Sequence, residues 1–400
     1  MADWNYTEIK LNRKRPEQLY SQLAGELSRQ IRRGDRAGQV LPSARKMAEE
    51  LGISRPTVQK AYDELFRQDL VKKKSAYFYQ VAARKKTLGQ EPFPSIGIIL
   101  PCRFSALLSD KNCIGAAPYI KGIIDSAMEN KLSTVMLELP AFDASREEIK
   151  AYTDSLTRRL IGLVHIGGRN HFPDRPLEAV LNMKELPQVF ISGIAKYPHI
   201  GAVLGDTTPG AIALAENLRA MNHQKIGVLH WHDRSGQEIY SSYYEYYAEK
   251  RDERVCSILK NYGLNCDERH QLYSCTSYQT VLKKLTALEK NGNLPTVFWC
   301  HNDDLAKWCI RALRGLGYQV PDDISVIGFN GLPGNDEEEL TTISLPFYAI
   351  GHRSVTQLMN YYKNGITEKN RFVYLKTFLI AGKTLAEANH TEIQIRGDMK

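Results

Sequence analysis

The pattern of apolar and polar positions changes character near residue 95. Before it, apolar residues recur at helical spacing in three short stretches, residues 19–31, 44–51 and 55–65. After it, short apolar runs alternate with longer amphipathic stretches, a pattern typical of parallel strands joined by helices. We therefore expect a small helical domain at the N-terminus, followed by a larger α/β body.

Capping residues set the bounds of the second and third N-terminal helices. Ser43 is placed to cap the second helix, Gly52 supplies the positive φ that ends it, and Ser54 caps the third. Pro56 falls in the first turn of the third helix, where proline is tolerated. The residues that hold this helix to the core are Val58, Ala61 and Leu65. Two helices joined by such a turn predict a helix-turn-helix, whose second helix enters the major groove of DNA.

The polar side chains of this region predict the contacts with DNA. Arg55, Thr57 and Lys60 lie near the start of the third helix, the end that docks in the groove. Residues 69–81 read as two short strands around a basic turn, which is the shape of a wing. Lys72, Lys73 and Lys74 are then expected along a phosphate backbone.

The charge distribution supports a nucleic-acid-binding head. Residues 1–90 contain 19 Lys and Arg against 10 Asp and Glu, a balance of +9, whereas the whole chain of 400 residues carries +8. All the excess positive charge therefore lies in the first quarter, as in a DNA-binding module attached to a nearly neutral body. Residues 83–94 are charged, then proline-bearing, and have no periodicity, so we expect a linker there.

The body reads as two successive α/β sets, which predicts two doubly wound subdomains with a crevice between them. The expected strands are residues 96–100, 134–139, 162–166, 188–191, 202–204, 226–229, 296–299 and 324–329. The expected helices are residues 120–130, 146–159, 210–221, 251–261, 278–290 and 304–316. The predicted domains are a winged-helix head over residues 1–82 and an effector-binding and dimerisation body over 95–400. Within the body, we expect one subdomain of about 95–198 with 334–364, and another of about 199–333 with 365–385.

The head closely resembles the winged-helix domain of the GntR family over about residues 16–82. The residues that carry the resemblance are Leu41-Pro42-Ser43, Arg45, Ala48, Leu51-Gly52-Ile53-Ser54-Arg55, Thr57-Val58, Ala61, Leu65 and Leu70-Val71. The resemblance implies that Arg45, Ser54, Arg55 and Thr57 contact DNA. Gln59 departs from the pattern, since many members of the family have an arginine there.

The body, about residues 95–385, resembles the periplasmic-binding-protein-like effector domain of the LacI/GalR repressors. The matching residues include Asp206, Asn222-His223, Ile226-Gly227, Asn302-Asp303, Val320-Pro321, the run from Asp323 to Asn330, and Leu340-Thr341-Thr342-Ile343. In that family, polar side chains at strand ends bind the effector, and the matching positions here are Arg251, Asn302 and Asn330. A GntR head on a LacI-like body is also the arrangement of AraR-type sugar-responsive repressors, which the chain resembles over nearly its whole length.

Sugar recognition needs planar polar groups that match vicinal hydroxyls, together with a flat apolar surface. Arg251, Asn302 and Asn330 supply the first. Trp231 or Phe104 supplies the second, although Trp231 is equally suited to packing the subdomain core. Asp206 fits either the crevice or a helix N-terminus, and Arg251 has an alternative partner in the adjacent acidic residues of its helix.

Other chemistries find less support in the sequence. His230, His232 and Asp233 are suitable metal ligands but have no evident distant partner, so we expect no metal site and no cofactor. The seven cysteines are scattered and never spaced as C-x-x-C. His301-Asn302-Asp303 has no accompanying nucleophile, and a pyridoxal-phosphate-binding body of the kind fused to some GntR heads would need a much larger domain. We therefore expect no enzyme.

These observations together predict a DNA-binding transcriptional regulator, most simply a repressor. Its expected partners are a two-fold operator on double-stranded DNA, a second copy of the chain, and a small effector such as a mono- or oligosaccharide bound in the crevice. The alternative is a regulator whose crevice no longer binds a sugar and that responds to a protein partner or to a non-sugar ligand. With no long apolar run in the chain, we expect no membrane partner and a cytoplasmic location.

Limited proteolysis tests this division into head and body. Trypsin should cut first within residues 84–94, because that stretch is basic and expected to be exposed. The fragment that begins near Ser95 should stay folded and dimeric in sedimentation. The isolated head should bind DNA poorly, since it lacks a tethered second copy. A monomeric body fragment would contradict the predicted dimer.

Overall fold

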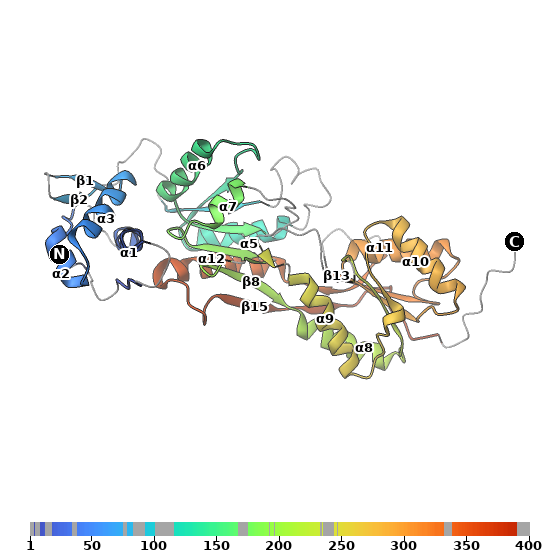
Figure 1. The fold of residues 1–400 in the computed structure, drawn as a ribbon. Coiled ribbons are helices and arrows are strands. Elements are labelled where there is room, and N and C mark those ends of the chain that lie inside the picture. Colours follow the sequence, from blue (N-terminus) through green and yellow to red (C-terminus); the bar gives the residue numbers. More distant parts are fainter. Residues whose placement is uncertain are drawn as a thin grey trace.

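A computed structural model shows three lobes in a row, with the N-terminal domain at one end (Figure 1). The residues that the structure describes are 4, 9–12, 18–33, 38–74, 78–82, 93–100, 116–166, 175–191, 193–195, 197–232, 234, 244–245, 247–331 and 338–389. Among them, no helix has the length and apolar content that a membrane span requires. The expected linker thus lies almost wholly outside the described residues.

The N-terminal domain is a three-helix core with a small sheet. Its elements are α1 (Leu19–Arg33), α2 (Ala44–Leu51), α3 (Arg55–Arg67), β1 (Val71–Lys73) and β2 (Tyr79–Val81). The predicted caps are confirmed. The Ser43 and Ser54 side chains accept hydrogen bonds from the backbone of α2 and α3, and Gly52 ends α2 with a φ of 60°. Strand β2 also bridges to Val40 ahead of α2, so the chain before the helix-turn-helix is tied to the wing.

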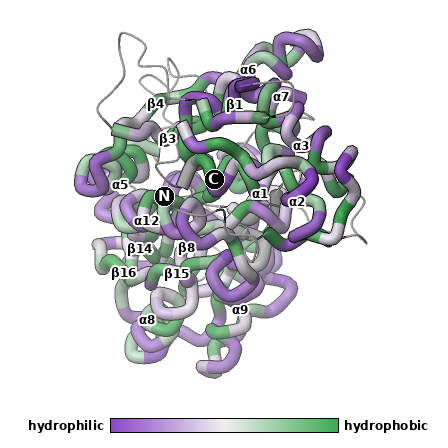
Figure 2. Tube along the Cα trace, turned by 90° about the vertical axis from the view of Figure 1, so that its left-hand side faces the viewer, coloured by the Kyte–Doolittle hydropathy of each residue, from purple (hydrophilic) through white to green (hydrophobic). Residues whose placement is uncertain are grey.

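The first body unit is a six-stranded parallel sheet in the order β15-β8-β6-β5-β3-β4. Its strands are β3 (Ser95–Ile99), β4 (Ser133–Leu137), β5 (Leu160–Ile166), β6 (Gln188–Ile191), β8 (Ile200–Asp206) and β15 (Phe372–Lys376). One face packs on α5 (Ala116–Glu129) and α12 (Phe347–Asn364), the other on α6 (Arg146–Arg159) and α7 (Arg175–Leu181). Helix α6 is largely hydrophilic on its outer side, and only Ile149 and Leu156 are buried (Figure 2).

The second body unit has a sheet in the order β11-β9-β12-β13-β14-β16, in which only β16 is antiparallel to its neighbour. Its strands are β9 (Ile226–Leu229), β11 (Gln271–Leu272), β12 (Val297–Cys300), β13 (Ser325–Asn330), β14 (Thr341–Ser344) and β16 (Phe378–Ile380). Helices α8 (Thr207–Ala220) and α9 (Tyr247–Asn261) cover one face, and α10 (Tyr278–Lys290) and α11 (Asp303–Gly315) cover the other. A short antiparallel pair, β7 (Ile194–Ala195) with β10 (Tyr244–Glu245), links the backbones of the two units.

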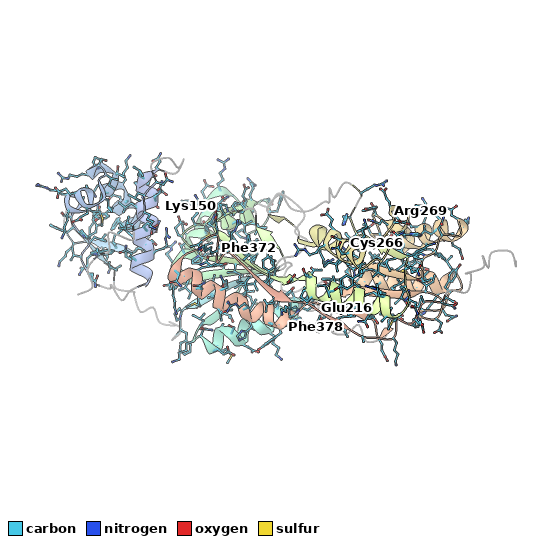
Figure 3. All side chains as sticks on the ribbon, turned by 90° about the horizontal axis from the view of Figure 1, so that it is seen from below. Lys150, Glu216, Cys266, Arg269, Phe372 and Phe378 are labelled. Carbon is cyan, nitrogen blue, oxygen red and sulfur yellow. The ribbon has the colours of Figure 1, made fainter. Side chains whose placement is uncertain are left out.

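The chain crosses between the two sheets three times, and this corrects the expected subdomain boundaries. Strand β8 belongs to the first sheet rather than to the second unit, β14 belongs to the second sheet, and β15 returns to the first. Figure 3 shows Phe372 of β15 in the first unit and Phe378 of β16 near the junction. The apolar pattern of a buried parallel strand is the same in either sheet, so the pattern alone did not reveal which sheet each strand joins.

Two glycines bring α5 and α12 into direct contact across the first unit. A Cβ atom on Gly122 would lie 2.1 Å from the Tyr348 carbonyl oxygen, and one on Gly351 would lie 2.1 Å from the Tyr119 carbonyl oxygen. No larger residue fits either position without moving a helix backbone. This packing holds α12, which follows the second crossing, firmly on the first unit.

Replacing Thr377 by valine tests how far the third crossing stabilises the body. The Thr377 hydroxyl, in a side chain only 3% exposed, donates to the Asp206 carbonyl oxygen at 2.8 Å and accepts from the Gly210 amide at 3.1 Å. Thr377→Val should lower the free energy of unfolding by about 1–3 kcal/mol, because it leaves a buried amide without its acceptor. Urea titration followed by circular dichroism measures the shift.

The matched control is Thr153→Val on α6, whose hydroxyl makes an exposed bond to the Lys150 carbonyl oxygen. It should change the stability by less than about 0.5 kcal/mol. If both variants lowered the free energy of unfolding equally, the Thr377 hydrogen bonds at the third crossing would not contribute to stability beyond an exposed hydrogen bond.

Candidate functional site

The first candidate site is the surface around the start of α3. Ser54, Arg55 and Lys60 are exposed, and Thr57 is half-buried, with its hydroxyl 2.7 Å from the Ser54 hydroxyl. The opposite face of the helix is buried through Val58, Ala61, Tyr62 and Leu65, as predicted apart from the added Tyr62. The helix therefore presents a polar end to solvent and anchors its other side in the core.

Arg45 extends this polar surface from the start of α2. Its Nε atom donates to the Glu49 carboxylate at 2.9 Å, and both side chains are largely exposed. An exposed pair of this kind contributes little to stability, so a phosphate can replace Glu49 as the partner of Arg45.

A hydrogen-bond chain joins α3 to the wing, and the sequence did not reveal it. The Gln59 amide donates to the Tyr79 hydroxyl at 2.8 Å, and that hydroxyl donates to the Asp63 carboxylate at 2.5 Å. Burial, with help from the Asp63 carboxylate, raises the pKa of Tyr79 to about 12. Gln59, the departure from the family pattern, thus fixes β2 against α3.

The two lysines of β1 lie on opposite faces of the wing. Strand alternation separates Lys72 from Lys73. The Lys73 ammonium lies 5.4 Å from the Phe66 ring centre and 5.8 Å from that of Tyr79, on the α3 side of the wing. The structure thus places Lys73 beside α3, whereas Lys72 and Lys74 are exposed elsewhere on the wing.

The second candidate site lies at one edge of the second sheet. Strands β9, β12 and β13 are adjacent and parallel, so their carboxyl ends meet at the same edge. Trp231 follows β9, Asn302 follows β12, and Asn330 ends β13. In open α/β sheets, ligands bind beyond the carboxyl ends of the strands. The expected effector residues from these strands are therefore brought to one edge.

Arg251 reaches the same edge from α9 and is buried there, with 8% of its surface exposed. Its guanidinium donates to the His301 carbonyl oxygen at 2.5 Å and stacks 4.0 Å from the centre of the Phe329 ring. Its Nε atom lies 3.6 Å from the Asp252 carboxylate. The alternative partner expected for Arg251 is thus present, but at the sheet edge and not on a solvated helix face.

The two asparagines have backbone roles at this edge as well. The Asn302 side-chain oxygen caps α11 by accepting from the Leu305 amide at 2.8 Å, which leaves its amide group as the donor to a ligand. Asn330 has a φ of 121° and therefore a backbone conformation that favours glycine. Its carbonyl oxygen accepts from the Leu345 amide at 3.0 Å in the second crossing. Asn330 thus connects the sheet edge to the junction.

The remaining predicted residues are placed as follows. Asp206 caps α8, where its side chain accepts from the Thr208 amide at 3.0 Å, and it lies at the first crossing. The Trp231 ring stacks on Trp308 at a centroid distance of 5.9 Å. Phe104 and Asp233 lie outside the described residues.

The sequence indicated His230 and His232 as possible metal ligands without a distant partner, and the structure places both beside the buried Asp252, which sequence reasoning missed. The Asp252 carboxylate, 1% exposed, faces His230 and His301 from the ends of β9 and β12 at 3.0 and 2.9 Å. Burial alone would raise the pKa of Asp252, but His301, His230 and His232 hold it well below its usual value. Burial also lowers the pKa of His301 to about 4. No sequence motif joins these residues, because they come from three separate segments.

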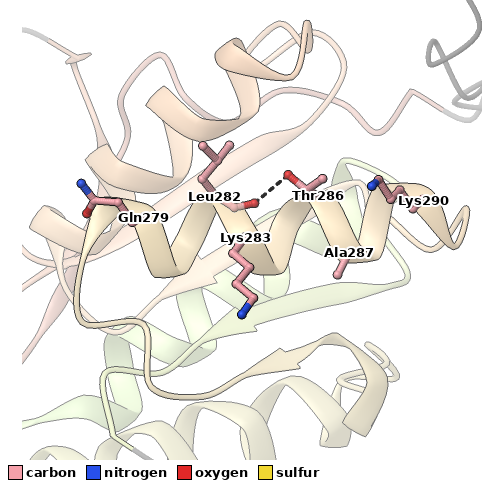
Figure 4. Close-up of a pocket in the computed structure, with 6 residues that line it drawn as sticks. All are labelled: Gln279, Leu282, Lys283, Thr286, Ala287 and Lys290. Atoms are coloured by element: carbon pink, nitrogen blue, oxygen red, sulfur yellow. Dashed lines mark hydrogen bonds between the residues drawn. The ribbon is translucent and has the colours of Figure 1, made fainter.

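A shallow hollow of about 460 Å³ lies on the outer side of α10 (Figure 4). Its lining residues all come from this one helix and are Gln279, Leu282, Lys283, Thr286, Ala287 and Lys290. None of the predicted effector residues lines it. We therefore place the candidate effector site at the sheet edge and not in this hollow.

Comparison with known proteins defines the class to which the chain belongs. Residues 19–76 match the bacterial regulatory proteins of the gntR family, and residues 215–385 match the periplasmic binding protein-like domain. The chain thus joins a GntR-type DNA-binding domain to a periplasmic-binding-protein-like body. This combination defines a transcriptional regulator.

Individual relatives and solved structures match most of the chain. The chain is 25% identical to an arabinose metabolism transcriptional repressor of Halalkalibacterium halodurans, over 78% of this chain and 82% of the relative. It is 23% identical to the protein of the same name from Geobacillus stearothermophilus, over 91% and 97%. A LacI-family regulator from Enterococcus faecalis with bound ribose has the same body fold, with a TM-score of 0.52, 19% identity, and coverage of 74% of this chain and all of that one.

Arg55→Ala tests the assignment of α3 as the recognition helix. Loss of Arg55 should weaken specific operator binding by about 1–3 kcal/mol if its guanidinium contacts a base edge. Lys73→Ala should instead weaken binding to all duplexes alike. It should also reduce the slope of log affinity against log salt concentration by about one. Gel-shift titrations with operator and scrambled DNA at several salt concentrations measure both effects.

Arg67→Ala at the far end of α3 is the control, since Arg67 pairs with Glu64 at 2.8 Å. It should leave the ratio of specific to non-specific affinity unchanged. If Arg55→Ala also left that ratio unchanged, α3 would not be the helix that reads sequence.

Proposed function

We propose that the chain is a sugar-responsive transcriptional repressor that binds a two-fold operator as a homodimer. The observation that carries this proposal is the convergence of Arg251, Asn302 and Asn330 at one sheet edge, in a body attached to a GntR-type head. Two heads in one dimer match two half-sites of the operator. DNA binding implies a cytoplasmic location in a bacterium.

The polar groups of this edge suit a ligand rich in hydroxyls. The Arg251 guanidinium and the Asn302 and Asn330 amides offer planar donors that match neighbouring hydroxyls, and Trp231 supplies a flat apolar ring. The solved relative with bound ribose and the relatives named for arabinose metabolism support a sugar. We infer a mono- or oligosaccharide effector, with Asp206 at the junction as a further contact.

In this proposal, the junction between the two units couples effector binding to DNA binding. A ligand that contacts both units favours the arrangement in which they are closed, and it shifts the balance only by its differential affinity for the two states. Because α12 and the first sheet lie between the head and the second unit, closure changes the spacing of the two heads in a dimer (Figure 1). In this proposal the chain acts by binding, and the edge residues contact the effector without catalysing a reaction.

Three conservative substitutions test the effector site. Arg251→Lys keeps the charge but loses the planar fork, Asn302→Asp keeps the helix cap but loses the amide donor, and Asn330→Gly keeps the backbone conformation but loses the side chain. Each should lower sugar affinity by about 5- to 150-fold, because a buried polar contact is lost at a cost of about 1–3 kcal/mol. Calorimetry with monosaccharides and short oligosaccharides measures this effect.

The control is Arg254→Ala, one turn along α9, where the side chain is exposed. Sugar affinity should not change in this variant, and all four variants should bind operator normally in the absence of sugar. If the wild-type chain binds its operator but none of the sugars, the alternative is favoured, in which the site binds a protein partner or a non-sugar ligand.

A further inference from the structure

The histidine cluster has the composition and geometry of a metal-binding site. Three imidazole nitrogens approach the same Asp252 carboxylate oxygen, Oδ2. These are His301 Nδ1 at 2.9 Å, His230 Nδ1 at 3.0 Å and His232 Nε2 at 3.4 Å. The ligand atoms of His230, His232 and Asp252 all lie within 4.8 Å of one another.

The hydrogen bonds around Gln271 determine which nitrogen of His230 carries a proton. The Gln271 amide nitrogen donates to the Cys266 carbonyl oxygen at 3.2 Å, so its amide oxygen must be the atom that faces His230. That oxygen accepts from the Tyr273 hydroxyl at 2.9 Å and lies 3.2 Å from His230 Nε2. Nε2 of His230 is therefore the protonated nitrogen, and the Nδ1 atom of a neutral ring presents a lone pair to Asp252.

A lone pair 3.0 Å from a carboxylate oxygen is unfavourable unless a cation lies between the two atoms. His301 and His232 can each donate an N–H to the carboxylate as neutral rings, so the need for a cation falls on His230. One ion placed among His230 Nδ1, His232 Nε2 and Asp252 Oδ2 meets this need, and the competing arrangement is a second proton on His230. In this arrangement Gln271 acts as an outer partner that orients a metal-binding histidine.

We propose that His230, His232 and Asp252 bind one Zn²⁺ ion, with the fourth coordination position open. Nitrogen and carboxylate ligands suit zinc, whereas calcium and magnesium prefer oxygen alone. In a tetrahedral zinc site the ligand atoms lie about 3.3–3.5 Å apart, given bonds of about 2.0–2.2 Å. His230 Nδ1 and His232 Nε2 lie 3.0 and 3.4 Å from Asp252 Oδ2, which approaches this value.

The ion would link two segments of the second unit. Asp252 belongs to α9, and His230 and His232 follow β9. Because Asp252 is adjacent to Arg251 on α9, the ion would also fix the helix turn that carries Arg251 to the candidate effector site. The metal site stands on its own geometry, so it does not depend on the identity of the effector.

Metal binding by the full-length chain tests this proposal without DNA or sugar. The protein is stripped with a chelator and titrated with Zn²⁺ in competition with a chromophoric chelator, and with Co²⁺ as a spectroscopic probe. We expect one ion per chain and the intense visible absorption of four-coordinate Co²⁺. His232→Gln should weaken Zn²⁺ binding at least tenfold, and Gln271→Leu should weaken it about 10–100-fold through loss of the outer hydrogen bond.

The matched control is His352→Gln, which removes a histidine of the first unit that pairs with Glu129 at 2.8 Å. This variant should bind Zn²⁺ like the wild type, and circular dichroism verifies that each variant is folded. The proposal is overturned if the wild type binds no stoichiometric Zn²⁺, if Co²⁺ gives only the weak spectrum of six-coordinate sites, or if His232→Gln binds as tightly as the control. Any of these results would leave the cluster as a hydrogen-bonded network.

Discussion

The three crossings between the two sheets are the constraint on which the rest of the body depends. Because the chain passes between the units three times, the units are held together and can change their arrangement only by bending at the junction. Thr377 connects the first and third crossings through its bonds to Asp206 and Gly210. Leu345 connects the second crossing to the end of β13 through Asn330. The end of β13 at the sheet edge is therefore joined to the junction by a backbone hydrogen bond.

Two buried carboxylates organise the edge that this junction controls. Asp252 gathers the histidines from β9 and β12. Asp303 accepts hydrogen bonds from the Thr342 hydroxyl at 2.6 Å and from the Gly331 amide at 2.8 Å, and so ties β13 to β14. A buried carboxylate is costly unless it is paired, so each one fixes the segments that supply its partners. The polar edge is therefore held in place, because each buried carboxylate pairs with groups from more than one strand.

The head was predictable in detail because its signals are local. Each cap involves residues four positions apart or fewer, so Ser43, Gly52 and Ser54 set the helix bounds without help from the rest of the fold. The link from Gln59 to Tyr79 was not predictable in this way, because the two residues are twenty positions apart and meet only when the wing folds back on α3. Sequence reasoning therefore predicted α2, α3 and their caps but not the contact that holds the wing to α3.

In the body, the sequence by itself determined the alternation of strands and helices and the placement of Asn302 and Asn330 at strand ends. It did so because hydrophobic periodicity and turn residues act over a few positions. Only the tertiary structure decided which sheet each of β8, β14 and β15 joins, and which side chains surround Asp252. Those outcomes depend on contacts between segments far apart in the chain, for which a parallel strand or a lone histidine carries no local signal.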